Sequence, residues 1–242
     1  MTKKITPYKD STLGKKQQIA QMFDTISNEY DDLNRVISFG IDIKWRNKVV
    51  QIVAETKPDN ILDIATGTGD LAINLTRTNA TQIIGLDISE GMLEVGRKKI
   101  LKKELHKTID MVVGDSENLP FDADTFDAIT VAFGVRNFEN LEIGLAEIFR
   151  VLKPGGLFVV LETSVPTKFP FKQGYYLHNK IVLPLVGKLF SKDKVAYSYL
   201  SESASKFPYG KAFNNILDKI GFTSSKAYPQ TFGVATIYTA TK

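Results

Sequence analysis

One stretch constrains this chain more than any other. The apolar run Asn60–Ile64 leads directly into a turn that contains Gly67 and Gly69. This pattern predicts a buried strand, a tight turn and a helix that begins at about Asp70. Glycine suits the turn because a residue without a Cβ lets the backbone approach a ligand closely. Asp87 ends the next apolar run about 20 residues on, where its carboxylate can accept hydrogen bonds from a ribose diol. The pattern therefore predicts a nucleotide-type pocket.

The glycine turn by itself leaves two adenosyl ligands open. Gly67–Ala72 can be aligned with the G-x-G-x-x-A form of the dinucleotide fingerprint, which would indicate NAD. A diphosphate at a helix N-terminus favours amides and positive potential, whereas Asp63 and Asp70 flank this turn with carboxylates. Carboxylates attract a ligand that carries an ammonium and a sulfonium group. We therefore favour S-adenosylmethionine over NAD.

The length and composition fit one globular domain. At 242 residues, with 43% hydrophobic and 24% charged residues, the chain can bury one sizeable core, and we expect a single domain over residues 15–242. There is no cysteine, which excludes disulfides, thiolate metal sites and cysteine nucleophiles. His106 and His178 are the only histidines. They are too few for a histidine metal site and belong to no hydrolase motif, so we predict no bound metal.

The net charge of +4 resides in the first 20 residues, which hold five lysines against Asp10. The rest of the chain is neutral, which excludes nucleic acid as the expected partner, because such binders carry a basic face on the folded body. We interpret the basic cluster at Arg97–Lys107 as a solvated helix face, with anionic lipid as its alternative partner. No apolar run reaches membrane-spanning length, and no signal-peptide pattern is visible. We predict a cytoplasmic protein, with peripheral contact at the inner face of a membrane as a further hypothesis.

Strand-like and helix-like patterns alternate through the middle of the chain. Such alternation predicts βαβ units with right-handed crossovers and a mostly parallel sheet. A further helix and two strands complete the C-terminal part. The expected strands cover residues 61–65, 82–87, 109–113, 126–133, 157–162, 224–228 and 234–240, and the expected helices cover 70–77, 89–103, 141–152 and 208–220.

Three segments lie outside this alternation. Residues 1–14 are polar and lysine-rich, and we predict a disordered tail. Residues 15–57 show helical periodicity and predict an N-terminal helical lid or wall over the pocket. Residues 165–205 are rich in aromatic and apolar side chains and predict a helical insertion. This insertion suits a long apolar substrate, core packing or a dimer surface.

In an open parallel sheet, ligands bind outside the carboxyl ends of the strands. Two polar stretches besides the glycine turn and Asp87 fall there. Gly114–Glu117 follows the third expected strand, and Gly134–Asn137 follows the fourth. The Asp115 carboxylate is placed to bond an adenine amino group, with a structural turn as the alternative.

Several motifs resemble the signatures of one known family. The first signature is matched by Tyr30-Asp31-Asp32-Leu33-Asn34, continuing through Ser38-Phe39-Gly40 to Trp45. The second is matched by Arg150-Val151-Leu152-Lys153-Pro154-Gly155-Gly156, running on to Ser164. Phe133–Asn137 and Tyr199–Ser203 match as well, so the resemblance spans nearly the whole chain from Phe23. The family that these motifs resemble is that of the ubiquinone and menaquinone biosynthesis C-methyltransferases.

The resemblance implies a class I S-adenosylmethionine-dependent methyltransferase fold, which is Rossmann-like, α/β, and built on a mostly parallel seven-stranded sheet with helices on both faces. It also implies methyl transfer to a ring carbon of a polyprenylated quinol. The family's cofactor contacts fall on Thr68, Asp87, Asp115 and Ser116. The chain departs from the family pattern at three positions, where Leu33, Asp42 and Ala132 replace methionine, histidine and serine.

Methylation of a quinol carbon is favoured when the ring hydroxyl loses its proton. Arg136 and Asn137, at the end of the fourth expected strand, can stabilise the developing phenolate by donating hydrogen bonds. Tyr30 can position the ring or relay the proton. The alternative for Arg136 is a structural salt bridge with a lid carboxylate, and for Tyr30 a packed helix residue.

Several alternatives stay open at this point. Demethylmenaquinol is the favoured substrate, and the 2-polyprenyl-6-methoxy-1,4-benzoquinol of ubiquinone biosynthesis is the alternative within the family. An NAD-dependent oxidoreductase and a non-catalytic S-adenosylmethionine-binding subunit are the alternatives from other classes. The expected partners are the quinol and, as a further hypothesis, a second copy of the chain in a homodimer.

Overall fold

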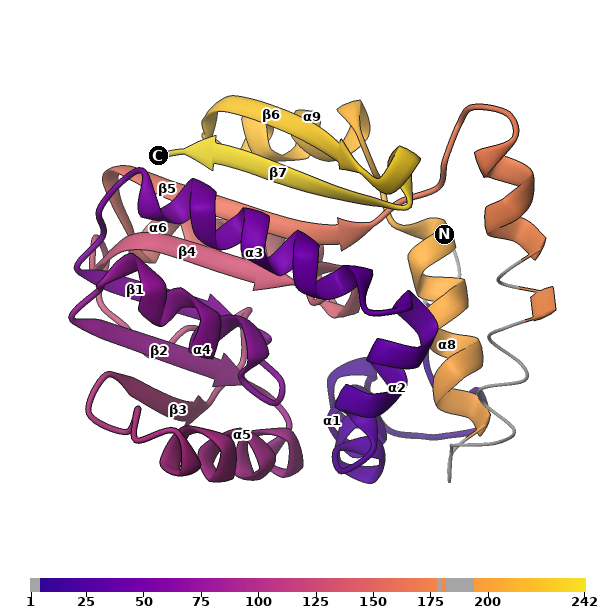
Figure 1. Cartoon of the computed structure of the whole chain (residues 1–242), viewed down its shortest axis with the longest axis horizontal. Helices are drawn as coiled ribbons and strands as arrows, with labels where there is room; N and C mark the ends of the chain where they lie inside the picture. The colour runs from indigo at the N-terminus through magenta and orange to yellow at the C-terminus, as the bar shows by residue number, and fades with distance from the viewer. Residues whose placement is uncertain (1–4, 178–179, 182–193) are drawn as a thin grey trace.

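The computed structural model of the chain describes residues 5–177, 180–181 and 194–242. In this part of the chain seven strands form one sheet in the order β3-β2-β1-β4-β5-β7-β6 (Figure 1). Strands β1 to β5 run parallel, and β7 is antiparallel to both β5 and β6. The predicted Rossmann-like fold is therefore confirmed. The strands are β1 (Asn60–Ile64), β2 (Gln82–Asp87), β3 (Ile109–Val113), β4 (Phe126–Ala132), β5 (Leu152–Thr163), β6 (Thr223–Gln230) and β7 (Ala235–Thr241).

Helices cover both faces of the sheet because successive strand residues point to opposite faces. In β5, Phe158 and Val160 pack into one apolar core, whereas Val159 and Leu161 pack into another. The first core includes helices α6 (Leu141–Val151) and α9 (Lys211–Ile220). The second core includes α3 (Ile41–Ala54), α4 (Asp70–Leu75) and Ile100 of α5 (Glu90–Lys102). Both faces of the central strands are therefore buried, as their continuous apolar sequences require.

A third apolar core lies beyond the carboxyl ends of the parallel strands. It joins α1 (Lys15–Ile26), α2 (Tyr30–Ser38) and α8 (Lys194–Lys206) to Met92 at the start of α5. In Figure 1 these helices occupy the right-hand half of the molecule, toward which the strand arrows of β1, β2, β4 and β5 point. The edge of the sheet where ligands are expected is therefore covered by helices.

The segment 15–57 divides between two roles. Helices α1 and α2 lie over the strand ends, as expected for a lid, but α3 packs along the sheet through Trp45, Val49, Val50 and Val53. Within the segment predicted as a disordered tail, Ile5 and Tyr8 pack against the third core. The Tyr8 amide donates a hydrogen bond to Gln18 at 2.9 Å.

Several boundaries differ from the sequence-based expectations. Helix α4 ends at Leu75 and continues as a short 3-10 turn, Thr76–Thr78. The turn predicted over residues 153–156 lies within β5, where it produces a register shift against β4 between Phe126 and Ala128. Residues 171–177 and 180–181 of the predicted insertion are helical, and α8 follows.

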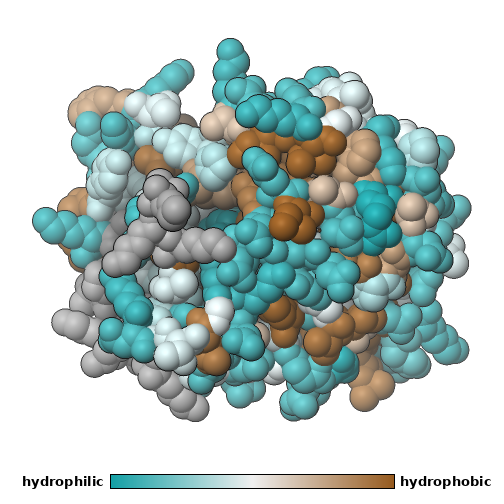
Figure 2. All heavy atoms as spheres, turned by 180° about the vertical axis from the view of Figure 1, so that it is seen from behind, coloured by the Kyte–Doolittle hydropathy of each residue, from teal (hydrophilic) through white to brown (hydrophobic). Residues whose placement is uncertain are grey.

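The outer surface agrees with a folded globular chain. The face opposite to that in Figure 1 is mostly hydrophilic, and its apolar side chains form separate patches (Figure 2). Among the described residues, no helix has the length and apolar character needed to cross a bilayer.

Gly96 sets how closely α5 approaches the glycine turn. A Cβ built at this position would lie 2.4 Å from Met111 Cε and 3.2 Å from the backbone carbonyl carbon and oxygen of Thr68. The Met111 side chain can move, but the Thr68 backbone belongs to the turn itself. A side chain at residue 96 would therefore push the helix and the turn apart.

We expect Gly96→Ala to lower the free energy of unfolding by about 1–3 kcal/mol, because overpacking outweighs the gain in helix propensity. Urea denaturation measures this loss. Gly174→Ala is the matched control, because Gly174 is also helical and its Cβ would meet no atom within 4 Å. The control should be neutral or stabilised by up to about 1 kcal/mol. Equal effects of the two substitutions would contradict this account.

Candidate functional site

The glycine turn curls back over the end of β2. The Thr66 amide donates to the Leu86 carbonyl at 3.1 Å, and the Gly67 amide donates to Asp87 Oδ2 at 2.8 Å. Gly67 has a φ of +58°, and the space that a Cβ would occupy is open. Glycine is therefore used here both for its backbone conformation and for the open space beside it.

Asp87 lies where the turn and β2 meet. Its second oxygen, Oδ1, accepts a hydrogen bond from the Ser89 amide at 2.9 Å. Burial raises the pKa of Asp87, and the hydrogen bonds from backbone amides oppose this effect. Each carboxylate oxygen has more than one lone pair. Asp87 therefore keeps acceptor capacity toward the cavity that it lines.

Asp63 lies in the layer behind the turn. It is the register partner of Thr130 on β4, and its oxygens accept hydrogen bonds from Thr66 Oγ1 at 2.6 Å and Thr130 Oγ1 at 2.7 Å. Burial raises the pKa of Asp63 to about 6, although both threonine hydroxyls favour the ionised form. Asp63 does not line the cavity. It fixes the start of the turn to the neighbouring strand.

A cavity of about 70 Å³ lies at the carboxyl ends of β1 to β4. Of the predicted cofactor residues, Gly67, Asp87, Asp115 and Ser116 line it, as does Asn137 from the predicted catalytic set. The Lys16 ammonium of α1 reaches into its wall and pairs with Asp115 at 2.7 Å and Glu117 at 3.0 Å. Sequence reasoning missed Lys16 because it assigned this residue's charge to the basic N-terminal segment.

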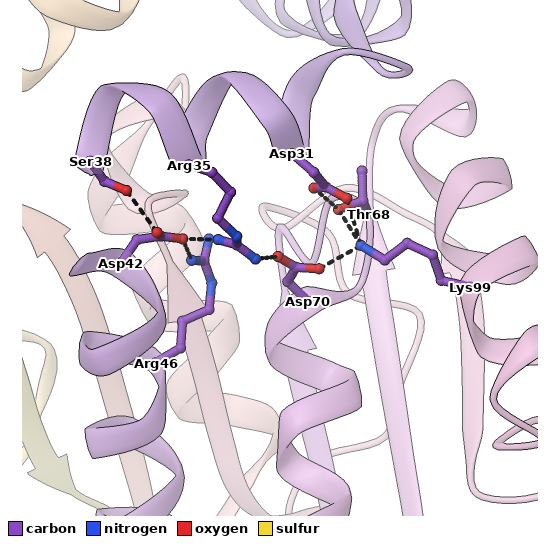
Figure 3. A network of polar contacts seen from close by, with 8 residues as sticks. All are labelled: Asp31, Arg35, Ser38, Asp42, Arg46, Thr68, Asp70 and Lys99. Carbon is purple, nitrogen blue, oxygen red and sulfur yellow. Dashed lines mark hydrogen bonds and ion pairs between the residues drawn. The ribbon is translucent and has the colours of Figure 1, made fainter. Parts of the chain in front are cut away.

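Thr68 and Gly69 face away from the cavity, toward α2 and α5. Thr68 Oγ1 donates to Asp31 at 2.6 Å. The Lys99 ammonium donates to Asp31 at 2.8 Å and to Thr68 Oγ1 at 3.1 Å, and it also pairs with Asp70 (Figure 3). The outer side of the turn is thereby bound to the lid helix.

The same network continues along α2 to α3. Arg35 pairs with both Asp70 and Asp42, and Asp42 also pairs with Arg46 and accepts a hydrogen bond from Ser38 at 2.7 Å (Figure 3). Burial alone would raise the pKa of Asp70, but the Lys99, Arg46 and Arg35 cations lower it below its usual value. Asp70 is therefore neutralised by protein cations and adds no free negative charge to the cavity.

A second, larger cavity of about 610 Å³ is lined by residues of α2, α3 and α8 and by residues 170–175 and 231–234. Its wall is mostly apolar and includes several aromatic rings. The rings of Phe171 and Phe232 stack at a centroid distance of 3.8 Å, and Trp45 lies 6.3 Å from Phe133. Polar groups of Asn34, Asp42, Arg46, Arg136, Thr163 and Ser201 also reach this cavity.

Tyr30 and Phe133 line both cavities. Burial raises the pKa of the Tyr30 hydroxyl, and a hydrogen bond with Asn34 and the nearby Arg136 cation oppose the shift. The raised pKa keeps Tyr30 protonated at neutral pH, so that it acts as a hydrogen-bond donor. The two cavities therefore meet at a wall made of one phenol and one phenyl ring.

Arg136 lies beside this wall and is almost fully buried. Its Nη1 pairs with Glu162 at the end of β5 at 2.5 Å and donates to the Phe133 carbonyl at 2.8 Å. Among the described residues, Arg136 Nε and Glu162 Oε2 are buried without a hydrogen-bond partner. Burial would lower the pKa of Arg136, but the Glu162 carboxylate raises it. Asn137 turns the other way and accepts a hydrogen bond from the Tyr199 hydroxyl at 3.2 Å.

The salt bridge of Arg136 thus joins the 3-10 turn Val135–Asn137, which follows β4, to the end of β5 and does not involve a lid carboxylate. Sequence reasoning missed Glu162 as its partner, although a charged residue directly after the apolar run Phe158–Leu161 was a usable signal. Phe171 and Phe232 gave no comparable signal. His178 lies outside the described residues, and the described ones include no cluster of three or more His, Cys, Asp or Glu side chains that could hold a metal ion.

Sequence comparison places these features in a known family. The sequence model of the ubiE/COQ5 methyltransferase family matches residues 11–242. A demethylmenaquinone methyltransferase of Bacteroides fragilis is 48% identical over 241 residues, covering 99% of this chain and 98% of the relative. A ubiquinone/menaquinone biosynthesis C-methyltransferase UbiE of Geobacter sulfurreducens is 42% identical and covers 99% of this chain and 93% of the relative.

Comparison with solved structures supports the fold. A putative S-adenosylmethionine-dependent methyltransferase of Methanococcus maripaludis matches with a TM-score of 0.64 at 21% identity, covering 91% of this chain and 94% of that one. A methyltransferase of Thermotoga maritima matches with a TM-score of 0.62 at 19% identity, covering 93% and 99%. At this level of identity the likeness concerns the fold alone.

The raised pKa of Asp63 predicts a pH-dependent stability. Because the pKa of about 6 in the folded chain exceeds the ordinary 3.8, the folded state holds an extra proton between these values. The stabilisation that this proton gives the folded state is complete below pH 3.8 and is lost as the pH rises through about 6. From about pH 5 to about pH 7.5 the wild type should lose on the order of 1 kcal/mol relative to Asp63→Asn.

Thermal melts of both proteins across this range measure the difference, which corresponds to about 2–4 °C in Tm. Asp127→Asn is the control. The pKa of Asp127 is lowered, chiefly by hydrogen bonds from Lys153 and from the Asn60 and Asp59 amides that outweigh burial, so its effect should stay constant in this range. A constant gap between the wild type and Asp63→Asn would refute the assignment.

Proposed function

The chain belongs to the ubiE/COQ5 methyltransferase family and is an S-adenosylmethionine-dependent methyltransferase, and we propose that it methylates a ring carbon of demethylmenaquinol. The observation that carries this proposal is the shared wall of Tyr30 and Phe133 between a cavity at the strand ends, which Asp87 and Asp115 line, and a larger, mostly apolar cavity. A methyl donor and an apolar acceptor can occupy such cavities and meet at their common wall.

The cofactor prediction of S-adenosylmethionine is confirmed by the family, and NAD is not favoured. The chemistry of the smaller cavity suits an adenosyl group, because Asp87 retains acceptor capacity and the space beside Gly67 is open. We propose that Gly67, Asp87, Asp115 and Ser116 contact the cofactor. The turn is held in shape by three residues that do not line the cavity, namely Asp63, Thr68 and Gly69.

The larger cavity supports a polyprenylated quinol as the acceptor. Trp45, Phe133, Phe171 and Phe232 offer flat apolar surfaces to a fused ring system. Curated relatives from Bacteroides fragilis, Porphyromonas gingivalis and Bacillus cereus are named demethylmenaquinone methyltransferases. These names favour demethylmenaquinol over the benzoquinol of ubiquinone biosynthesis, which the family also includes by name.

Bound S-adenosylmethionine supplies the methyl group, and the chain's own residues prepare the acceptor. We propose that Arg136 stabilises the negative charge that develops on the quinol oxygen, because its charge is permanent and its Nε has no partner among the described residues. Tyr30, held protonated, donates a hydrogen bond at the wall between the cavities. Asn137 lines the cofactor cavity and accepts a hydrogen bond from the Tyr199 hydroxyl. In this proposal the pair positions the bound cofactor.

The acceptor is itself a lipid, and this proposal therefore implies contact with a membrane surface. Peripheral contact at the inner face of a membrane, which the sequence offers as a further hypothesis, is therefore part of this proposal. A homodimer stays a prediction, which sedimentation of the purified chain tests.

We expect Asp87→Ala to weaken S-adenosylmethionine binding about 10²-fold or more, since it removes charge-assisted hydrogen bonds to the ribose. Isothermal titration calorimetry gives the affinity. Asp110→Ala, at an exposed aspartate of the neighbouring β3, should bind normally. Unchanged affinity of the Asp87 variant would sink the assignment of this cavity.

We expect Arg136→Lys to lower kcat with demethylmenaquinol about 10²–10³-fold, because the shorter-reaching ammonium loses the planar donor set. The affinity for S-adenosylmethionine should stay within about twofold, as Arg136 does not line the smaller cavity. Arg150→Lys serves as the control, because Arg150 also pairs with a glutamate and donates to backbone carbonyls but lines neither cavity. A normal rate for the Arg136 variant would exclude its role at the phenolate.

A further inference from the structure

Exposed apolar side chains line the larger cavity or lie next to its lining residues in the sequence. Phe39 and Phe232 line the cavity, yet they are 72% and 66% exposed. Next to the lining residues Pro170, Phe171 and Tyr175 in sequence, Phe169 is 79%, Tyr176 55% and Leu177 60% exposed. We call this set the apolar rim: Phe39, Phe169, Tyr176, Leu177 and Phe232. Singly exposed apolar residues need no explanation, but a group around one opening marks an interaction surface.

The charged side chains in the segment that carries most of the rim are all positive. From Thr163 to Ile181 the chain carries Lys168, Lys172 and Lys180 and no aspartate or glutamate. Lys168 and Lys172 flank Phe169, and all three lysines are exposed. Aromatic side chains interleaved with lysines suit the interface of an anionic bilayer, where the rings enter the headgroup region and the ammonium groups face lipid phosphates.

We propose that the apolar rim docks on an anionic lipid bilayer and so opens the larger cavity directly to the membrane. The proposal rests on the proposed function, because a polyprenylated acceptor resides in the bilayer. In Figure 1 the short turn that carries Phe232, the helical residues 171–177 and α2 all lie toward the end of the molecule to which the parallel strands point. Docking there leaves the helices that cover the two faces of the sheet in solvent.

The basic cluster at Arg97–Lys107 is a weaker candidate for the same partner. Its Lys99 is paired with Asp31 and Asp70, and Arg97 is paired with Glu90 at 2.6 Å. Of the exposed large apolar side chains, only Leu101 lies in this cluster. The cluster therefore supplies charge without an apolar surface, and its lysines serve as the control.

Cosedimentation of the full chain with vesicles tests the docking surface. The vesicles contain either phosphatidylcholine alone or phosphatidylcholine with about a third phosphatidylglycerol. We expect at least tenfold tighter binding to the anionic vesicles, with the difference reduced at high salt. Equal binding to both vesicles, or none to either, overturns the proposal.

Two pairs of matched variants locate the surface. Phe169→Gln with Leu177→Gln should weaken binding to anionic vesicles at least tenfold, whereas Leu101→Gln with Ile143→Gln, at side chains 66% and 51% exposed elsewhere, should not. Lys168→Gln with Lys172→Gln should remove most of the salt dependence, whereas Lys102→Gln with Lys103→Gln should retain it. The opposite result in either comparison places the contact at the control residues and rejects the rim.

Activity with two acceptors separates the rim from the proposed function. The Phe169 and Leu177 double variant should methylate a water-soluble, short-chain demethylmenaquinol like the wild type, but lose at least tenfold in rate on a long-chain acceptor embedded in vesicles. Equal rates on both acceptors reject the rim and leave the proposed function standing. A wild type that methylates neither acceptor rejects the proposed function, even if it binds vesicles.

Sedimentation velocity tests whether the rim is instead a contact between two copies of the chain. If the wild type is a dimer, the double variant is a monomer and vesicle binding is unchanged, the lipid assignment is overturned.

Discussion

The ion-pair network around Asp70 is the interaction on which the site depends. Lys99 of α5 and Arg35 of α2 meet at this carboxylate, and the pairs extend from Asp31 at one end to Asp42 at the other (Figure 3). Asp42 is nearly fully buried, and breaking a buried pair by removing one partner costs about 3–5 kcal/mol. The network holds α2 against the outer side of the glycine turn. Since α2 carries Tyr30, it also fixes the wall between the two cavities.

Much of the fold could be predicted because the apolar pattern of each element is local. The runs at β1, β2, β3 and β4 predict the strands to within one residue, and their alternation with helices predicts the parallel sheet. The less certain boundaries have structural reasons. The glycines at residues 155 and 156 look like the end of a turn, but the sheet takes them up as a bulge in β5. The division of residues 15–57 into two lid helices and one sheet-covering helix depends on tertiary packing, which helical periodicity does not encode.

The candidate site was predictable in its composition and less so in its geometry. A glycine turn and a carboxylate at a strand end can both be located from their position in the sequence pattern. Four residues predicted in this way line one cavity, namely Gly67, Asp87, Asp115 and Ser116. The electrostatic argument for S-adenosylmethionine reached the right cofactor, but its premise, two free carboxylates beside the turn, does not hold. Asp70 finds cations 29 and 35 residues away in the chain, and Asp63 is enclosed by two threonines. Pairings over such separations are properties of the folded chain, and one sequence does not reveal them.

The buried Arg136–Glu162 pair explains how a cation can be kept beside an apolar cavity. A lone guanidinium there would face a large desolvation penalty, and an arginine cannot escape it by losing its proton. Glu162 offsets this penalty by pairing with Nη1 of Arg136. The Nε of Arg136 has no hydrogen-bond partner among the described residues. A buried donor left unsatisfied costs about 1–3 kcal/mol, which a negatively charged group that arrives in the site would recover. In the proposed mechanism the pair favours the ionised acceptor over the neutral one, and this preference is what methyl transfer to a quinol carbon requires.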